Sequence, residues 1–199
     1  MIDKRDVQAF FDRLAPEWDA GLVRNETVIG RILDNAGVQP GCRVLDVACG
    51  TGVLFGDYLR RGTAQVTAID LSPEMAARAA EKAAGTQITV LCGDVEADPA
   101  VRAGAPYDVV MVYNAVPHFP DPAVLIQTLA GLVKDGGRLS IAHGMSRAAL
   151  DAHHSGSARP VSRGLLHENR LKTLMAPYLD VDVVISDDEM YQVCGIKRA

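Results

Sequence analysis

Five strand-like apolar runs alternate with helical patterns through residue 142. These runs occupy residues 43–48, 64–69, 88–92, 107–113 and 138–142. A helix between consecutive strands is typical of a parallel sheet, because a parallel connection must cross back over the sheet. Two later runs, residues 181–185 and 190–196, are separated only by residues 186–189, which favours an antiparallel hairpin. We therefore expect an α/β sandwich: a seven-stranded, mostly parallel sheet with a C-terminal antiparallel hairpin and helices on both faces.

The length and charge of the chain restrict the classes of protein to which it can belong. It has 199 residues, enough for one domain with a sizeable core, and a formal net charge of -5. An acidic protein has no general attraction to phosphate backbones, so nucleic acid is not an expected partner. The N-terminus is not a signal peptide and no run approaches the ~20 apolar residues of a membrane span, so we expect a cytoplasmic protein without membrane insertion. Four scattered cysteines without a C-x-x-C pair favour reduced thiols over a disulfide framework.

A turn that contains glycine follows the first predicted strand and carries the strongest local signal. Residues 46–52 read Asp-Val-Ala-Cys-Gly-Thr-Gly, and a second acid, Asp70, ends the next strand. Glycine lets the backbone turn sharply and lets a ligand approach without a Cβ in the way. The carboxyl ends of the strands are where open α/β sheets bind ligands, so we expect a binding site at this turn.

The residues of this turn discriminate between cofactors. Dinucleotide folds use G-x-G-x-x-G, whose third glycine permits close helix packing beside a pyrophosphate. Phe55 occupies that third position here, and Asp46 would place negative charge near a pyrophosphate. Both features argue against a nicotinamide-dependent oxidoreductase, which stays as the weaker alternative. The two carboxylates, Asp46 and Asp70, suit a cationic ligand that carries an ammonium group and a ribose.

Several motifs occur in order at the ends of the predicted strands. They comprise residues 46–52, 70–75, 92–95, 113–115 with 118–119, and 134–139. With these motifs the chain resembles the class I S-adenosylmethionine-dependent methyltransferases. Residues 10–19 look like the start of the small-molecule branch of methyltransferase type 11, which includes quinone methyltransferases. The resemblance implies a Rossmann-like fold, one methyltransferase domain over residues 1–199, and S-adenosylmethionine as the cofactor, with S-adenosylhomocysteine as the product.

The resemblance also implies roles for individual residues. Asp46, Gly50 and Gly52 would surround the methionine part of the cofactor, Asp70 would hold the ribose, and Asp94 would receive the adenine amino group. Simple turn glycines or a loop cap would explain some of these residues if each stood alone. The full set expected at the cofactor is Asp46, Ala48, Gly50, Thr51, Gly52, Asp70, Leu71, Met75, Asp94, Val95, Asn114, Phe11 and Trp18.

The reaction implied is direct in-line transfer of a methyl group from S-adenosylmethionine to a small-molecule acceptor, EC 2.1.1.-. Acceptor specificity is expected in variable segments, here residues 1–24 and 144–178, which we interpret as lid and acceptor-binding segments. Phe11 and Trp18 either close over the cofactor or pack in the core. A non-catalytic S-adenosylmethionine-binding protein would keep the same motifs and stays open as the alternative. The sequence leaves the oligomeric state open.

Four histidines fall at or after the carboxyl ends of the last predicted parallel strands. His118 follows the fourth strand, His143 ends the fifth, and His153 and His154 lie in the segment that follows. A neutral imidazole accepts a proton from a nucleophile near neutral pH, so these four are our candidates for catalytic residues on the acceptor side. Structural hydrogen bonding and metal binding are the alternatives. Because the histidines lack clear metal-ligand spacing, no metal site is expected.

Overall fold

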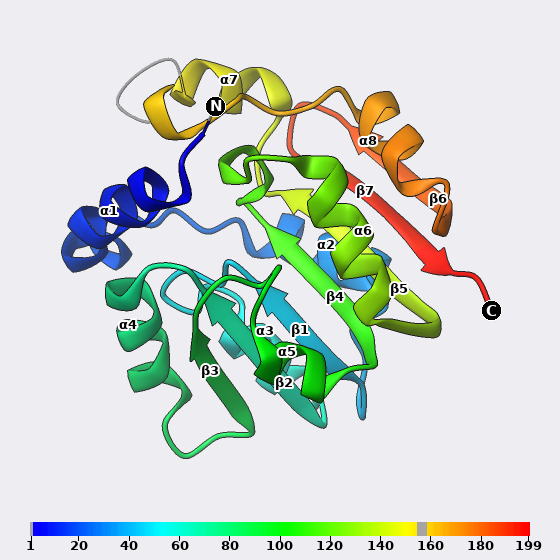
Figure 1. Ribbon diagram of the computed structural model, residues 1–199, viewed down its shortest axis with the longest axis horizontal. Helices are drawn as coiled ribbons and strands as arrows, with labels where there is room; N and C mark the ends of the chain where they lie inside the picture. Colours follow the sequence, from blue (N-terminus) through cyan, green and yellow to red (C-terminus); the bar gives the residue numbers. More distant parts are fainter. Residues whose placement is uncertain (1, 155–158) are drawn as a thin grey trace.

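The computed structural model of the chain describes residues 2–154 and 159–199. Parallel strands and helices alternate along the chain as far as β5, and the last two strands then follow one another closely (Figure 1). The helices and strands are α1 (Lys4–Leu14), η1 (Ala15–Glu17), η2 (Asp19–Gly21), α2 (Glu26–Asn35), β1 (Arg43–Val47), α3 (Phe55–Arg60), β2 (Gln65–Asp70), α4 (Pro73–Ala83), β3 (Ile88–Cys92), α5 (Pro99–Gly104), β4 (Tyr107–Tyr113), η3 (Val116–His118), α6 (Pro122–Leu132), β5 (Val133–His143), α7 (Arg147–His154), η4 (Arg159–Val161), α8 (Glu168–Met175), β6 (Leu179–Ser186) and β7 (Tyr191–Lys197).

The strands form one seven-stranded sheet in the order β3-β2-β1-β4-β5-β7-β6. Strands β1 to β5 pair in parallel, whereas β7 pairs antiparallel with both β5 and β6. The predicted mostly parallel, Rossmann-like sheet with a C-terminal antiparallel hairpin is confirmed. The strand order reverses between β1 and β4, and open α/β sheets bind ligands at the carboxyl ends of the strands at such a point.

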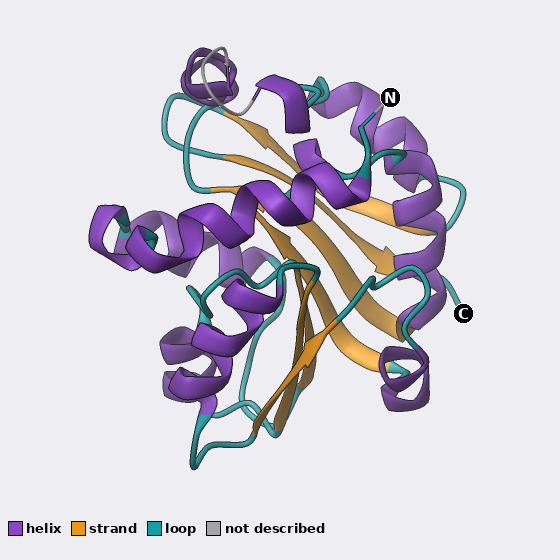
Figure 2. Cartoon of the chain, turned by 60° about the vertical axis from the view of Figure 1, so that its left-hand side comes forward, coloured by secondary structure: helices purple, strands orange, loops and turns teal. Residues whose placement is uncertain are grey.

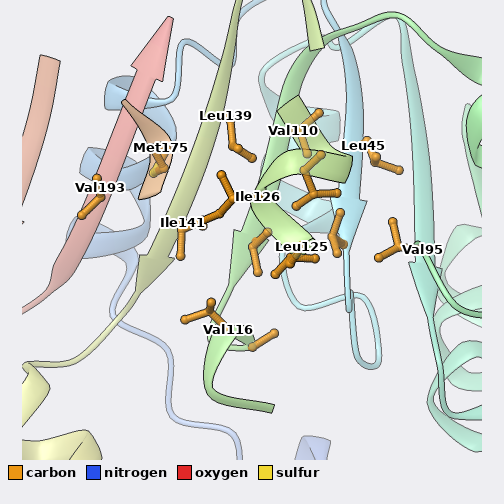
Figure 3. Packing of buried hydrophobic residues seen from close by; sticks show 14 of the residues in the cluster. Leu45, Val95, Val110, Val116, Leu125, Ile126, Leu139, Ile141, Met175 and Val193 are labelled. Atoms are coloured by element: carbon orange, nitrogen blue, oxygen red, sulfur yellow. The ribbon is translucent and has the colours of Figure 1, made fainter. Parts of the chain in front are cut away.

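Each face of the sheet packs against its own set of helices. On one face, α6 and α8 cover apolar side chains of β1, β4, β5 and β7 (Figure 3). On the other face, α2, α3 and α4 cover a second apolar cluster. Neighbouring residues of one strand supply the two clusters, because side chains alternate between the two faces of a pleated strand. Val44 and Leu45 of β1, for example, face opposite sets of helices. Leu139 of β5 faces α6.

Side-chain caps begin three of the helices at the positions that the sequence indicates. Asn25 accepts a hydrogen bond from Val28 N and begins α2, and Asp121 accepts from Ala123 N and begins α6. Ser72 accepts from Met75 N at 3.1 Å and begins α4. Each cap satisfies a backbone N–H that has no partner within its own helix.

Two elements differ from the prediction. Strand β5 begins at Val133, so the predicted turn at residues 135–137 lies inside a strand, where the pairing register with β4 shifts. Gly136 has φ +76°, which lets the backbone of β5 bulge there. Helix α5 was not predicted because it has six residues and buries only Val101, too few for a helical period to appear.

The helix that follows the N-terminus lies across the carboxyl ends of the parallel strands (Figure 2). It is α1, and α7 lies beyond the same edge of the sheet (Figure 1). These two helices belong to the two segments that we interpreted as lid and acceptor-binding segments. Within the described part of the chain, none of the helices is both long enough and apolar enough to span a bilayer.

Leu139→Ala is expected to lower the free energy of unfolding by about 3 kcal/mol, because Leu139 is fully buried and its truncation leaves a cavity in the core. Val184→Ala is the matched control, since Val184 also lies in a strand but is 37% exposed and should cost about 1 kcal/mol or less. Urea unfolding followed by circular dichroism measures both values. Equal losses in the two variants would contradict this account of the core.

Candidate functional site

A cavity of about 600 Å³ lies at the carboxyl ends of strands β1 to β4. Residues 2–24, which we call the N-terminal segment, form part of its wall. Most of its wall is apolar, and its acidic groups come from the turns that follow β1, β2 and β3. Of the residues expected at the cofactor, the following line this cavity: Asp46, Ala48, Gly50, Asp70, Leu71, Met75, Asp94, Val95, Asn114, Phe11 and Trp18. The fold therefore brings residues from five separate stretches of sequence to one site.

Asp70, the last residue of β2, connects two of the turns around the cavity. Its Oδ2 accepts a hydrogen bond from Gly50 N at 2.8 Å, and its Oδ1 accepts from Ser72 N at 2.9 Å. Burial raises the pKa of Asp70, whereas these backbone hydrogen bonds favour the ionised carboxylate. Each oxygen still has a lone pair, so the carboxylate can accept further hydrogen bonds from the hydroxyls of a ligand in the cavity.

The two glycines of the turn have different roles. Gly50 lines the cavity with φ +57°, and a Cβ built there would meet nothing within 4 Å. Gly52 does not line the cavity: a Cβ on it would come within 2.6 Å of the Phe55 ring. The placement of Gly52 at the cofactor stays a prediction. Gly52 makes room for Phe55, the residue that replaces the third glycine of the dinucleotide motif.

Thr51 lies between these glycines, and its placement at the cofactor also stays a prediction. It is fully buried and does not line the cavity. Its hydroxyl donates to Asp19 Oδ1 at 2.6 Å and accepts from Lys82 Nζ at 3.2 Å. Thr51 thus contacts the N-terminal segment rather than the interior of the cavity.

Asp46 is the most strongly perturbed acid of the site. It is 2% exposed, and burial together with the negative charge of Asp70 raises its pKa to about 8. Asp46 is therefore largely protonated at neutral pH unless a positive charge is close to it. A ligand with an ammonium group would supply that charge and favour the ionised form.

The far end of the cavity is bounded by the turn after β3. Asp94 lies there, with its Oδ1 accepting from Glu96 N at 3.1 Å and its Oδ2 paired with Lys4 Nζ at 2.6 Å. Lys4 Nζ also pairs with Glu96. The ammonium of Lys4 is thereby neutralised by two carboxylates, although Lys4 itself lines the cavity.

Asn114 follows β4 in a left-handed conformation, with φ +56°. Its Oδ1 accepts from Gly144 N at 2.9 Å, and its own backbone N donates to Ala142 O at 2.9 Å. These bonds stabilise a conformation that is uncommon outside glycine, at a point where the side chain is exposed to the cavity. Ala48, in the turn after β1, has a similar conformation with φ +53°.

Polar contacts connect the N-terminal segment to the turns around the cavity. The carboxylate of Asp12 accepts from the hydroxyl of Ser72, the residue that begins α4. The guanidinium of Arg24 donates to Val53 O and to Asp57 Oδ2, the latter at 2.8 Å. Together with Lys4 and the Asp19–Thr51 contact, these bonds hold the segment against the cavity along its length.

Of the four candidate histidines, His118 has a side chain that lines the cavity. Its ring lies edge-on to Phe11, with the centroids 4.9 Å apart, and Phe11 in turn contacts Trp18. His118 Nδ1 is 2.8 Å from Val161 O, and a carbonyl oxygen only accepts, so Nδ1 carries the proton. In the neutral ring the lone pair is then on Nε2.

The other three candidates do not add to the described wall. His143 is fully buried, lies edge-on to Tyr191 and does not line the cavity, and its role on the acceptor side stays a prediction. His153 and His154 end α7, and their side chains lie outside the described residues. The sequence placed His143 at the correct edge of the sheet, but its side chain points into the core beside β7.

Much of the apolar part of the wall was not predicted from the sequence. These additional lining residues are Val7, Leu14, Leu22, Val23, Val53, Tyr113, Phe119, Pro120, Met145 and Leu150. Most of them lie in the two segments that we expected to form the lid and bind the acceptor. Their apolar character carried no specific signal, because the same residue types serve equally well in a core.

Among the described side chains, those of residues 2–150 and 160–199, no group of three or more from His, Cys, Asp and Glu is placed to hold a metal ion. The described wall of the cavity offers carboxylates, backbone amides, one imidazole and apolar side chains.

Comparison with known proteins agrees with this arrangement. A family model described as a methyltransferase domain matches residues 44–137. A ubiquinone biosynthesis O-methyltransferase of Vibrio cholerae is 35% identical over 146 residues, which cover 69% of this chain and 59% of that protein. One of the same description from Xanthomonas axonopodis pv. citri is 43% identical over 108 residues, or 53% of this chain and 44% of that protein. The chain thus spans about half the length of these relatives.

Solved structures match the fold over nearly the whole chain. Magnesium protoporphyrin IX methyltransferase from Synechocystis, solved with bound S-adenosylhomocysteine, has a TM-score of 0.74 at 22% identity and covers 99% of this chain and 100% of its own. A chain from the complex of the Haloferax volcanii Trm112 methyltransferase activator with the putative methyltransferase has a TM-score of 0.78 at 18% identity, covering 95% of this chain and 98% of its own. Since the ordered motifs, the strand order and the matched relatives all agree, the chain belongs to the class I S-adenosylmethionine-dependent methyltransferases.

Proposed function

We propose that the chain transfers a methyl group from S-adenosylmethionine to an uncharged, hydroxyl-bearing small molecule. The observation that carries this proposal is the pair of buried acids, Asp46 and Asp70, on either side of Gly50 in the wall of one cavity. A ligand that is cationic at one end and carries a ribose matches this pair. The names of the two relatives, both O-methyltransferases, support oxygen as the methylated atom.

The residues present fit this cofactor. Asp70 has lone pairs for ribose hydroxyls, Asp46 is a buried acid that a nearby ammonium would ionise, and Gly50 leaves room for the ligand's approach. Asp94 can accept a hydrogen bond from an adenine amino group, with Val95 packed beside it. When bound, S-adenosylmethionine supplies an electrophilic methyl group, so the chain itself needs only to bind, orient and exclude water.

A dinucleotide fits the same wall poorly. Asp46, Asp70 and Asp94 all line the cavity, and the positive charge of Lys4 is already paired with Asp94 and Glu96. A pyrophosphate would bring negative charge next to the Asp70 carboxylate and would oppose ionisation of Asp46, and both effects are unfavourable. Gly52 and Phe55 pack against each other in a way that replaces the third-glycine packing of dinucleotide folds. These observations disfavour the nicotinamide-dependent alternative.

The acceptor is assigned to the apolar half of the cavity. Phe11, Trp18 and Phe119 offer aromatic surface there, and Met145 and Leu150 add flexible aliphatic surface. An anionic acceptor would need a partner of opposite charge, and the lysine that lines the described wall is already paired. We therefore infer a neutral, apolar or aromatic acceptor, small enough to lie under the N-terminal segment rather than a nucleic acid.

His118 is our candidate for the group that receives the hydroxyl proton of the acceptor. Its Nδ1 donates to Val161 O, which orients the ring and selects the tautomer in which Nε2 is the basic nitrogen. The edge-on contact with Phe11 places the imidazole beside the aromatic part of the wall. Removing the proton as the oxygen acquires its methyl group would prevent the accumulation of positive charge on that oxygen.

Asp70→Ala should weaken the binding of S-adenosylhomocysteine by about 10- to 100-fold, because the variant loses charge-assisted hydrogen bonds to the ligand. Asp188→Ala is the matched control, since Asp188 is an exposed acid in the turn between β6 and β7. Isothermal titration calorimetry gives both dissociation constants. Tight binding of NADH without binding of either sulfur ligand would overturn the assignment of the cofactor.

Binding of S-adenosylhomocysteine should release a proton below about pH 8, because Asp46 must ionise to pair with the ammonium group of the ligand. The pKa of Asp46 is raised in the free protein and lowered by the ligand, so affinity should fall as the pH decreases below about 8. The limiting slope is about ten-fold per pH unit. Calorimetry in buffers of different ionisation enthalpy counts the protons, and Asp46→Asn should abolish their release. Equal proton release by this variant would contradict the role of Asp46.

His118→Ala should reduce turnover by about 100- to 10,000-fold while the affinity for S-adenosylhomocysteine changes little, because a general base acts on the acceptor and not on the cofactor. The acceptor for this measurement comes from a panel of phenols and catechols, scored by formation of S-adenosylhomocysteine. His167→Ala is the control, since His167 is an exposed histidine that begins α8. Wild-type turnover by His118→Ala would remove His118 from the mechanism.

A further inference from the structure

Three side chains from separate parts of the chain close a ring of polar contacts beside the cavity. Asp19, in η2, accepts from the Thr51 hydroxyl through Oδ1 at 2.6 Å. Its Oδ2 pairs with Lys82 Nζ at 2.7 Å, and Lys82 Nζ also donates to Thr51 Oγ1 at 3.2 Å. We call these three residues the Asp19 clamp. The clamp joins the N-terminal segment, the glycine turn and helix α4.

The residues next to the clamp gain little stability from apolar burial. Helix η2 has no buried residue, and Ala15 is the buried residue of η1. Val23 is 94% exposed, and Trp18 is half-buried. Burial of an apolar face is the usual source of stability for a short helix, so residues 15–23 depend strongly on their polar contacts.

The charges of Asp19 and Lys82 and the burial of Thr51 strengthen the contacts of the Asp19 clamp. Burial alone would raise the pKa of Asp19, but the hydrogen bonds from Lys82 and Thr51 lower its pKa, so the carboxylate is charged at neutral pH. Thr51 is fully buried, and a buried hydroxyl that loses its partner is costly. The side chains of Asp19 and Lys82 are 44% and 40% exposed, so dissolved salt can weaken the pair.

The position of the clamp connects it directly to the cavity. Trp18 precedes Asp19 and residues 21–23 follow it, and all of these line the cavity. On the other side of the clamp, Thr51 is adjacent to Gly50, which lines the same cavity. The Asp19–Thr51 contact therefore joins the cover of the cavity to the turn that forms its wall, and the Asp19–Lys82 pair joins the cover to α4.

We propose that Asp19, Thr51 and Lys82 are positioning residues that hold residues 15–23 over the cavity and thereby slow the exchange of the cofactor and its product. This inference rests on the proposed function, because the molecule that exchanges is S-adenosylmethionine or S-adenosylhomocysteine. Product must leave after each methyl transfer, and movement of a covering segment often limits that step. A half-exposed ion pair is individually weak, so the Asp19–Lys82 pair can break during turnover.

Trp18 allows the clamp to be tested without any ligand, because it is the single tryptophan of the chain. Quenching of its fluorescence by acrylamide measures how exposed the segment is. We expect stronger quenching in Asp19→Ala than in the wild type, and a smaller increase in Thr51→Val and Lys82→Gln, which each keep part of the ring. Lys82→Arg keeps the charge and should restore the wild-type value.

The dissociation rate of S-adenosylhomocysteine, measured by stopped-flow fluorescence, tests the effect on exchange. Asp19→Ala and Lys82→Gln should release it about three to ten times faster, the range expected when a half-exposed ion pair is removed. Added salt should accelerate release from the wild type but not from Lys82→Gln, because this variant has no ion pair to screen. Asp180→Asn is the control, since it removes an exposed carboxylate that pairs with Arg198 Nε at 2.7 Å.

The two measurements separate the possible outcomes. If Asp19→Ala is folded, as judged by thermal unfolding, and both quenching and release are unchanged, the clamp does not hold the segment. Stronger quenching with unchanged release would also overturn the proposal, because exchange would not depend on the segment. If the wild type fails to bind S-adenosylhomocysteine, the proposed function fails, while quenching of Trp18 in the free proteins still decides whether the clamp exists.

Discussion

The carboxylate of Asp70 holds together the two turns from which the rest of the site is built. One of its oxygens accepts from Gly50 N and the other from Ser72 N, so it determines the distance between the glycine turn and the start of α4. A carboxylate with so little exposure requires such donors, since burial disfavours its charged form. Ser72 extends the same network, because its hydroxyl begins α4 and also donates to Asp12 of the N-terminal helix.

The cover of the cavity is stabilised differently from the sheet below it. The sheet buries two large apolar clusters. The N-terminal segment, whose helix α1 crosses the strand ends in Figure 2, is joined to the cavity turns by side-chain hydrogen bonds and ion pairs. Polar contacts at a half-exposed surface contribute less than apolar burial, so the cover belongs to the less stable part of the structure. Such a division suits a site that must close around its ligand and then release it, while the strand ends that carry the acids stay in place.

The acidic residues of the cavity wall could be predicted to lie together because they are next to strand ends in sequence. Asp46 and Asp70 belong to β1 and β2, and parallel strands bring their carboxyl ends to one edge without further information. The direction of each side chain at that edge was less predictable. His143 shares its face of β5 with Ile141 and packs against Tyr191, and the Thr51 hydroxyl points away from the cavity toward Asp19.

By itself, the sequence determined the order of strands and helices, the caps at Asn25, Ser72 and Asp121, and the acids of the glycine turn, because all of these depend on neighbours along the chain. Only the tertiary structure decided which residues form the apolar wall and which contacts hold the cover over it. Asp19 is 32 positions from Thr51 in the sequence and still farther from Lys82. Local periodicity in the sequence does not predict such pairs, because they form only when the sheet brings its turns together.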